Sequence, residues 1–467
     1  MWFCSTMGCI LSSEALYDTG PTPSVSVSVV GEVYIYVPGF RAPKYVDLKG
    51  TLHGSISADL LSRLQQLRSQ VLIALGKYTP ASKSRRFRRP HQQDTPAAVH
   101  LEKALVNYLP VLLGFMTKGE KLTSGLFFEW TNVEDENKET SMGSVYYELL
   151  SVLHLLGVLA LQEANTCLTP RPPAEGYSPK VTEDSKRNAI ELLLKAASYL
   201  ECALRAVLPN TPEDVKEKLP AALTESMLRA IENQALGHGI ELQLGFAVDN
   251  VKASLAVKRR IACEHVKVWE EVSEKLVCAP LADGRREKYL LFVNWKLSEA
   301  KVGAYYFHGL ILDEGYEDNM HAQAITCLRA AETFLKESQR IKVEFGNAEP
   351  MTKVPPSWGA IKYLSEKIPR DVLVRARLFK EKYHKEILPV ATPQLPVFQL
   401  ALKADQYNLP PIDPAWEKET GYEGRYNLDS DLPAFLVKRD LSRKENGPSE
   451  LRRAQPILAT PAMVQAR

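Results

Sequence analysis

The sequence has almost no excess charge and no pattern of paired cysteines. Its 467 residues include 58 Lys and Arg against 56 Asp and Glu, for a formal net charge of +2. This near-neutral balance argues against a protein dedicated to binding nucleic acid. The seven cysteines, an odd number, are scattered without a CxxC pair. Such usage favours a reduced, cytosolic protein over a disulfide-bonded or zinc-binding one.

Signals for secretion and membrane spanning are also missing. The longest apolar run, residues 149–161, is interrupted by Ser151 and His154 and is too short to cross a bilayer. The first residues contain neither the basic region nor the apolar run of a secretory signal. Together with the cysteine usage, these absences predict a cytoplasmic protein.

Motifs of the common enzyme classes are absent or imperfect. No HExxH or GxSxG occurs, and His238 lies alone between two glycines. Residues 114–121 resemble a phosphate-binding loop, but Glu120 stands where the lysine belongs and would repel phosphate. Asp440 suggests a kinase catalytic loop, yet Glu445 replaces the required Asn. We expect no catalytic residue, metal, cofactor or small-molecule substrate, with an enzyme of unrecognised type as a minor alternative.

The sequence does contain a long helical hairpin at residues 285–342. From Leu290 to Ile311, apolar residues recur every three or four positions and form one helical face. A second apolar face follows the same helix, and Gly315 is suited to end it in the left-handed conformation. A helix with two apolar faces needs neighbours on both sides. The pattern therefore predicts a helical solenoid, with the core of a globular helical domain as the alternative.

Short strands precede the helices. Strict alternation at residues 25–29 and β-branched or aromatic residues at 32–37 predict two or three strands. Ser57 is a good helix N-cap. After Pro389 the chain is rich in proline without clear periodicity, and the last 25 or so residues are predicted to be disordered. Further helices are predicted at residues 57–71, 97–118, 141–165, 181–208, 220–247, 250–278 and 353–388.

Two segments predict contact with membranes. Gly8 and Cys9 follow Met7 in a pattern that fits N-myristoylation with an adjacent palmitoylation site, provided that translation begins at Met7. Two acyl chains are about what stable anchoring needs. A basic loop could bind acidic lipid headgroups at roughly 1 kcal/mol per basic residue, although a solvated loop is the simpler interpretation. Its arginines are Arg85, Arg86, Arg88 and Arg89.

An ordered set of segments resembles the Bro-one domain of ALIX-like endosomal adaptors. The segments are VDLKGTL at 46–52, YLPVL at 108–112, FEW at 128–130, YYE at 146–148, LRAAETFLKES at 328–338 and YHKEILP at 383–389. The resemblance covers residues 25–415 and is greatest to plant proteins that consist of little else. It implies a mostly α fold: a curved helical solenoid with tetratricopeptide-like hairpins and a small N-terminal β-sheet.

The resemblance also implies a binding site. In the family, a concave apolar patch receives the C-terminal amphipathic helix of the main ESCRT-III filament subunit, which is helix-in-groove recognition. The corresponding residues here lie at about 225–272. Candidates are Ile240, Leu244, Val257 and Ile261, each of which could instead fill the core. Gly239 stands where the family carries a large apolar side chain.

We therefore expect residues 1–24 to carry the lipidation motif, 25–415 to form the Bro-one-like domain, and 416–467 to be a partly disordered extension. The predicted function is a non-catalytic scaffold that binds the ESCRT-III helix in endosomal sorting. It would lie on endosomal or other membranes as a peripheral protein. A generic tetratricopeptide-type adaptor for another protein is the alternative.

Overall fold

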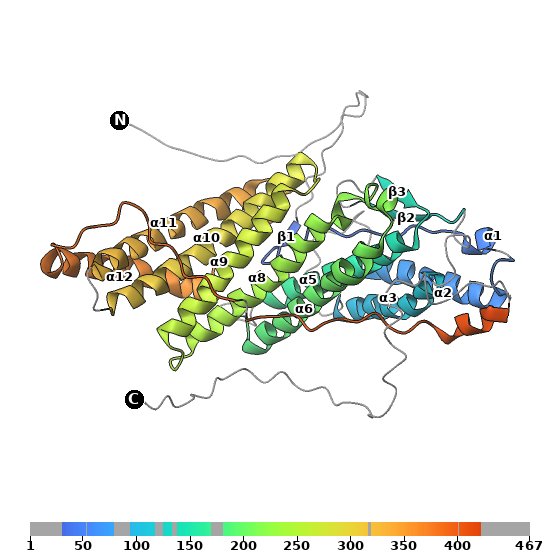
Figure 1. Ribbon diagram of the computed structural model, residues 1–467, viewed down its shortest axis with the longest axis horizontal. Coiled ribbons are helices and arrows are strands. Elements are labelled where there is room, and N and C mark those ends of the chain that lie inside the picture. Colours follow the sequence, from blue (N-terminus) through green and yellow to red (C-terminus); the bar gives the residue numbers. More distant parts are fainter. Residues whose placement is uncertain are drawn as a thin grey trace, which may run out of the picture.

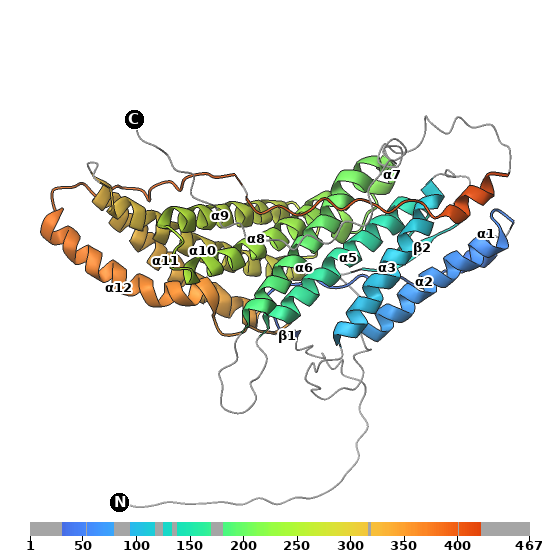
Figure 2. The same ribbon diagram turned by 90° about the horizontal axis from the view of Figure 1, so that it is seen from below.

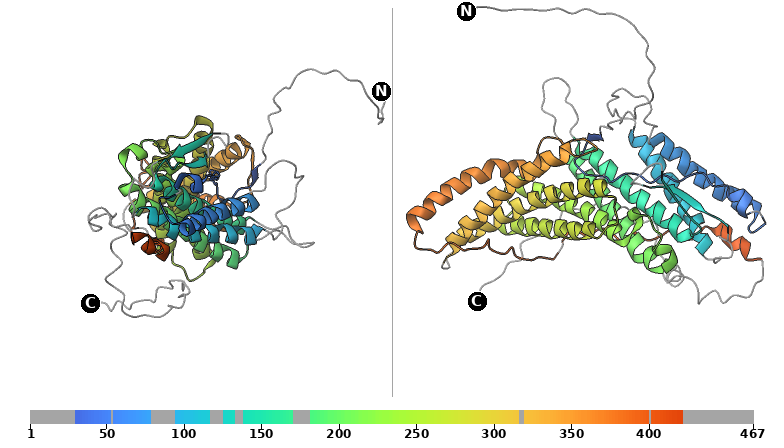
Figure 3. Two further views of the ribbon diagram at one scale, coloured as in Figure 1. Left: turned by 90° about the vertical axis from the view of Figure 1, so that its right-hand side faces the viewer. Right: turned by 90° about the horizontal axis from the view of Figure 1, so that it is seen from above.

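The protein is an elongated arch of helices packed side by side (Figure 1). The computed structural model describes residues 30–421, except for residues 53, 79–93, 117–124, 133–137, 170–180, 316–318 and 400. Viewed at right angles to Figure 1, from below or from above, the helices follow a curve with one concave and one convex side (Figure 2; Figure 3, right). The predicted mostly α, curved solenoid is confirmed.

The first half of the arch is built around one apolar helix. This half contains helices α1 (Leu48–Leu52), α2 (Ala58–Tyr78), α3 (Asp94–Met116), α5 (Val145–Leu168) and α6 (Glu183–Cys202). The Oγ atom of Ser57 accepts a hydrogen bond from the backbone N–H of Leu60 at 3.4 Å, as expected of the N-cap of α2. By length and composition α5 could cross a membrane, but 89% of its apolar window is buried inside the fold. It is the core helix of this half.

The second half contains the predicted hairpin. Its helices are α8 (Glu225–Asp249), α9 (Leu255–Val277), α10 (Asp283–Asp313), α11 (Met320–Asn347) and α12 (Gly359–Lys382). Short turns η1 (Ala203–Val207), η2 (Leu208–Asn210), α7 (Glu213–Lys216) and η3 (Ala221–Leu223) connect the two halves. The two apolar faces of α10 explain why α9 and α11 both pack on it.

The end of α10 differs from the prediction in one detail. Gly315 does not have the positive φ expected of it. The left-handed residue is Asn319, with φ of 60°, immediately before α11. Gly315 is needed for a different reason, since a Cβ atom there would collide with the side chain of Met320. Close approach of the two helix ends therefore accounts for the glycine.

Two small β-ladders accompany the helices. Strand β1 (Val30–Glu32) pairs in parallel with β4 (Thr352–Lys353), and β2 (Phe128–Thr131) pairs antiparallel with β3 (Glu139–Met142). The prediction of a strand to residue 37 is wrong beyond Glu32. The backbone N–H groups of Tyr34 and Ile35 both donate to Oδ1 of Asn165 at 2.8 Å. Because a side chain satisfies them, no partner strand is required.

Three of the segments that carry the family resemblance meet at one buried carboxylate. Glu148 is 1% exposed and accepts hydrogen bonds from Trp130 Nε1 at 2.6 Å, Arg68 Nε at 2.9 Å and the Tyr108 hydroxyl at 3.2 Å. Tyr108 comes from α3, Trp130 from β2 and Glu148 from α5. The network therefore joins these three elements and α2 in the interior.

After α12 the chain turns back and runs along the concave side as a strap, residues 391–399 and 401–413, which leads into η4 (Pro414–Gly421) (Figure 2). At its far end, the backbone N–H of Asp413 donates to the carbonyl of Pro110 at 3.1 Å, and Asp413 also pairs with Arg63 at 2.6 Å. The indole of Trp416 donates to the carbonyl of Val111 at 3.0 Å. The strap thus connects the α12 end of the arch to α2 and α3.

Several predicted features lie outside the described residues. These are the lipidation motif at Gly8 and Cys9, the alternating segment 25–29, the arginines at positions 85, 86, 88 and 89, and most of the C-terminal extension.

Candidate partner-binding surface

Two of the four candidate residues lie at the surface of α9. Val257 is 47% exposed, and Ile261, one turn later, is half-buried at the edge of the core. The Oγ atom of Ser254 accepts the backbone N–H of Val257 at 3.3 Å and caps the helix. Their spacing of four residues places both side chains on one face. Both can therefore contact a common ligand.

The other two candidates, on α8, are core residues. Ile240 has no exposed surface, and Leu244 is 3% exposed. Leu244 packs with Ala262 and Leu364 around Gly303, where α8, α9, α10 and α12 meet. The prediction that Ile240 and Leu244 contact a partner is therefore corrected: α8 is covered on nearly all sides, and these side chains fill the interior.

The strap covers the place where α8 lacks a side chain. Leu402 lies over Gly239 so closely that a Cβ atom at this position would be 2.6 Å from Leu402 Cδ2. Leu402 is itself buried. Contact with Leu402 therefore explains why this position of α8 is a glycine. A leucine from the same chain occupies the space that a large side chain of α8 would otherwise fill.

Further strap contacts lie on α9, beside the exposed candidates. The backbone N–H of Ala401 donates to Oε2 of Glu264 at 3.0 Å, and Arg260 pairs with the same carboxylate at 3.0 Å. The guanidinium of Arg259 lies 6.0 Å from the ring centre of Phe398, in the range of a cation–π contact. These strap residues were missed in the sequence because a proline-rich extended segment has no helical or strand period.

A buried ionic cluster joins α8, α10 and the segment after β1. Lys296 is 1% exposed and lies 3.0 Å from both Glu241 and Glu299. Glu241 also accepts the hydroxyl hydrogen of Tyr34 at 2.8 Å and lies 3.2 Å from Nδ1 of His238. Burial alone would lower the pKa of Lys296, but the two carboxylates raise it above its ordinary value. The positive charge of Lys296 lies between the two carboxylates, and this pairing offsets part of the cost of burying the three groups.

Two other buried histidines are neutral. Burial lowers the pKa of His154 to about 3 and that of His265 to about 4. For His265 the effect of burial outweighs that of nearby Glu241, which raises the pKa. Nε2 of His265 accepts the indole N–H of Trp269 at 2.9 Å. Among the described residues, neither imidazole has a carboxylate or hydroxyl partner of the kind that activates a nucleophile.

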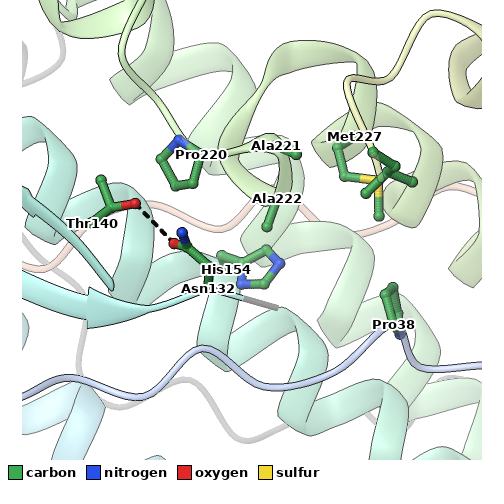
Figure 4. A pocket seen from close by; sticks show the side chains of 9 residues that line it. Pro38, Asn132, Thr140, His154, Pro220, Ala221, Ala222 and Met227 are labelled. Carbon is green, nitrogen blue, oxygen red and sulfur yellow. Dashed lines mark hydrogen bonds between the residues drawn. The ribbon is translucent and has the colours of Figure 1, made fainter. Parts of the chain in front are cut away.

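One small cavity lies beside His154, where the two halves of the arch meet (Figure 4). Its volume is about 80 Å³. The side chains of Asn132 and Thr140 line it and are hydrogen-bonded to each other at 2.9 Å. The remaining lining is apolar, from Pro38, Pro220, Ala221, Ala222, Met227 and Leu281. His154 is the sole titratable group among these residues, so the cavity does not assemble an acid–base pair.

The described residues thus form a curved arch of paired helices with an apolar edge on α9, which defines a helical binding scaffold. The BRO1-like domain family matches the sequence over residues 43–371. That match spans well over half of the chain, and the protein belongs to this family. Comparison with curated proteins gives no match.

Solved structures show the same fold. A Bro1 domain described for endosomal targeting is 17% identical, with a TM-score of 0.51 over 84% of this chain and 96% of that chain. ALIX bound to the SIVmac239 PYKEVTEDL late domain is 14% identical, with a TM-score of 0.58 over 84% of this chain and 51% of that one. The ALIX BRO1 domain in complex with CHMP4C is 13% identical, with a TM-score of 0.53 over 85% of this chain and 99% of that chain.

Proposed function

We propose that this protein is a non-catalytic adaptor in endosomal sorting that binds the C-terminal amphipathic helix of an ESCRT-III filament subunit. The family membership and the shared fold support the adaptor role. The solved complex of the ALIX BRO1 domain with CHMP4C supports the choice of partner. The observation that carries the proposal is the apolar face of α9, where Val257 is exposed beside Ile261.

The same part of α9 supplies charge around the apolar face. Arg260 is 52% exposed, and Lys258 and Arg259 are half-buried. A partner helix with acidic residues flanking its apolar stripe would be attracted to this end of α9. Because Arg260 is also paired with Glu264, its contribution is smaller than that of a free arginine.

The test is titration of a labelled ESCRT-III C-terminal peptide against the full chain and two variants. Val257→Asp and Ile261→Asp each place a charge in an apolar contact, a defect that costs a few kcal/mol when the partner binds. We expect the peptide affinity to fall about a hundredfold. Val257→Asp is the cleaner variant, since half of this side chain is already in water.

The matched control is Val277→Asp at the other end of α9, where the valine is 66% exposed. It should bind the peptide as the parent does. Thermal melting of each variant separates a lost contact from a lost fold, which matters most for half-buried Ile261. If the folded Val257→Asp variant binds the peptide with the affinity of the parent, the assignment of the site to this face of α9 is wrong.

One observation favours a second candidate, a helical adaptor for a different protein partner. Leu402 of the strap already occupies the space over Gly239, so the surface open to a partner is narrower than a groove across α8 and α9. If the parent does not bind the ESCRT-III peptide, this second candidate replaces the first.

We also propose peripheral association with endosomal or other membranes. The sequence pattern at Gly8 and Cys9 would supply acyl chains, and the arginines at 85, 86, 88 and 89 would supply positive charge. Neither segment is among the described residues, so this proposal rests on sequence alone.

A further inference from the structure

The second half of α12 has an apolar side that no other part of the described chain covers. All four buried residues of this helix, from Ala360 to Val372, lie in its first half or at its middle. Immediately after them, Leu373 is 63% exposed, Val374 55% and Leu378 41%. Exposed aliphatic residues continue after the helix with Ile387, Leu388 and Val390. We call residues 370–390 the α12 tip.

The exposed charges of the α12 tip are mostly positive. The basic residues with exposed side chains are Arg370, Arg377, Lys380, Lys382 and Lys385. None of these five forms an ion pair with a carboxylate in the described part of the chain. Glu381 is the one exposed acidic residue of the tip, so the exposed surface carries a clear positive excess.

The other acidic residues of the tip are engaged with the body of the protein. Asp371 accepts the hydroxyl hydrogen of Tyr306 at 2.6 Å. Glu386 accepts the backbone N–H of Ala322, at the start of α11, at 2.6 Å. Arg375 also pairs inward, with Asp313 at 2.7 Å. Two of the three acidic groups of the tip therefore bind inward, while five of its basic groups and the aliphatic side chains face water.

The position of this surface suits contact with a large flat partner. Helix α12 lies along the outer edge of the arch and reaches one of its ends (Figure 2; Figure 3, right). The strap leaves from this end toward the opposite, concave side. A surface that meets the α12 tip therefore does not have to displace the strap or approach α9.

We propose that the α12 tip binds the surface of an anionic phospholipid membrane. Lysine and arginine side chains would contact the headgroups, and Leu373, Val374, Leu378 and the residues after the helix would enter the boundary between headgroups and acyl chains. Basic groups interleaved with aliphatic ones are the composition of interfacial helices. This site is distinct from the acyl chains and the arginine loop, and it does not depend on binding of a partner helix.

The test is co-sedimentation of the full chain, produced in bacteria so that it carries no acyl chain, with lipid vesicles. We expect binding to vesicles of phosphatidylcholine mixed with phosphatidylserine and little binding to phosphatidylcholine alone. Binding should weaken as salt is added, because the attraction to the headgroups is screened.

Two double variants assign the binding to the tip. Leu373→Asp with Val374→Asp removes the aliphatic contact, and Arg377→Glu with Lys380→Glu reverses two charges. Each should weaken vesicle binding by about tenfold or more, given the contribution of each basic or buried aliphatic group at such a surface. All four side chains are exposed, so melting temperatures should stay near that of the parent.

The matched control is Val343→Asp with Lys336→Glu on neighbouring α11. Val343 is 62% exposed and Lys336 is 71% exposed, and this pair should bind vesicles like the parent. If the parent protein binds none of the vesicles, the proposal is overturned, and a protein partner becomes the alternative for the α12 tip. Equal binding by the parent and both tip variants also overturns it. Both tip variants should keep the parental affinity for the ESCRT-III peptide, which separates this test from that of the adaptor function.

Discussion

Glu148 shows how single residues hold distant parts of this chain together. Its three hydrogen-bond donors lie 18, 40 and 80 positions away in the sequence. Arg68 and Glu148 are each 1% exposed, and a buried charge loses its hydration unless it is paired. The segments containing Tyr108, Trp130 and Glu148 could be picked out from the sequence. Their meeting could not, because no period or spacing relates residues so far apart.

We predict that Glu148→Gln lowers the free energy of unfolding by about 3–5 kcal/mol, because Arg68 is left buried without an anion. Chemical denaturation would measure the loss. The control is Glu183→Gln, whose side chain is 71% exposed and 3.5 Å from Arg187, and which should change stability by less than about 0.5 kcal/mol. A loss of under about 1 kcal/mol at Glu148 would mean that the network is not a major source of stability.

At the scale of elements, apolar periodicity predicted the helices. It did not predict the strap or the burial of individual α8 side chains, which depend on contacts between distant parts of the chain. Helices α10 and α11 were predictable because each carries apolar residues every three or four positions over many turns. The strap was not, because its order comes from individual contacts such as Leu402 on Gly239. The burial of Ile240 and Leu244 was not predictable either. It results from elements far along the chain, including α12, that close over α8.

The fit between Gly239 and Leu402 gives a prediction for the strap. Gly239→Leu would place a large side chain on α8 and force Leu402 away, with a cost of about 1–3 kcal/mol typical of overpacking. Hydrogen exchange of the strap backbone around Leu402 should become faster, as measured by mass spectrometry. Gly284→Leu is the control, because a Cβ atom at Gly284 has no neighbour within 4 Å. Unchanged exchange in Gly239→Leu would show that the strap is held by its other contacts.

At the scale of the whole molecule, the neutral buried histidines couple stability to pH. The folded-state pKa values of His154 and His265, about 3 and 4, lie below the ordinary value of 6.5. Unfolding exposes both to water, so the unfolded chain binds more protons between these values. Their contribution to stability is complete above about pH 6.5. It is lost as the pH falls toward about 4 for His265 and about 3 for His154.

We therefore predict that the free energy of unfolding falls between about pH 7 and pH 5, by about 2 kcal/mol for each of these histidines. Urea unfolding at the two pH values measures the change. His265→Gln keeps an acceptor for Trp269 but does not titrate, so its stability should depend less steeply on pH than that of the parent. Equal stability of the parent at both pH values would contradict the prediction.

The strap also has a mechanical consequence for the arch. It is anchored at Phe398, Leu402 and Asp413 along the concave side, and an extended chain has a fixed maximum length. A load that straightens the arch would stretch this side and must first break those anchors. A load that bends the arch more tightly only slackens the strap. The arch should therefore resist straightening more strongly than it resists tighter bending.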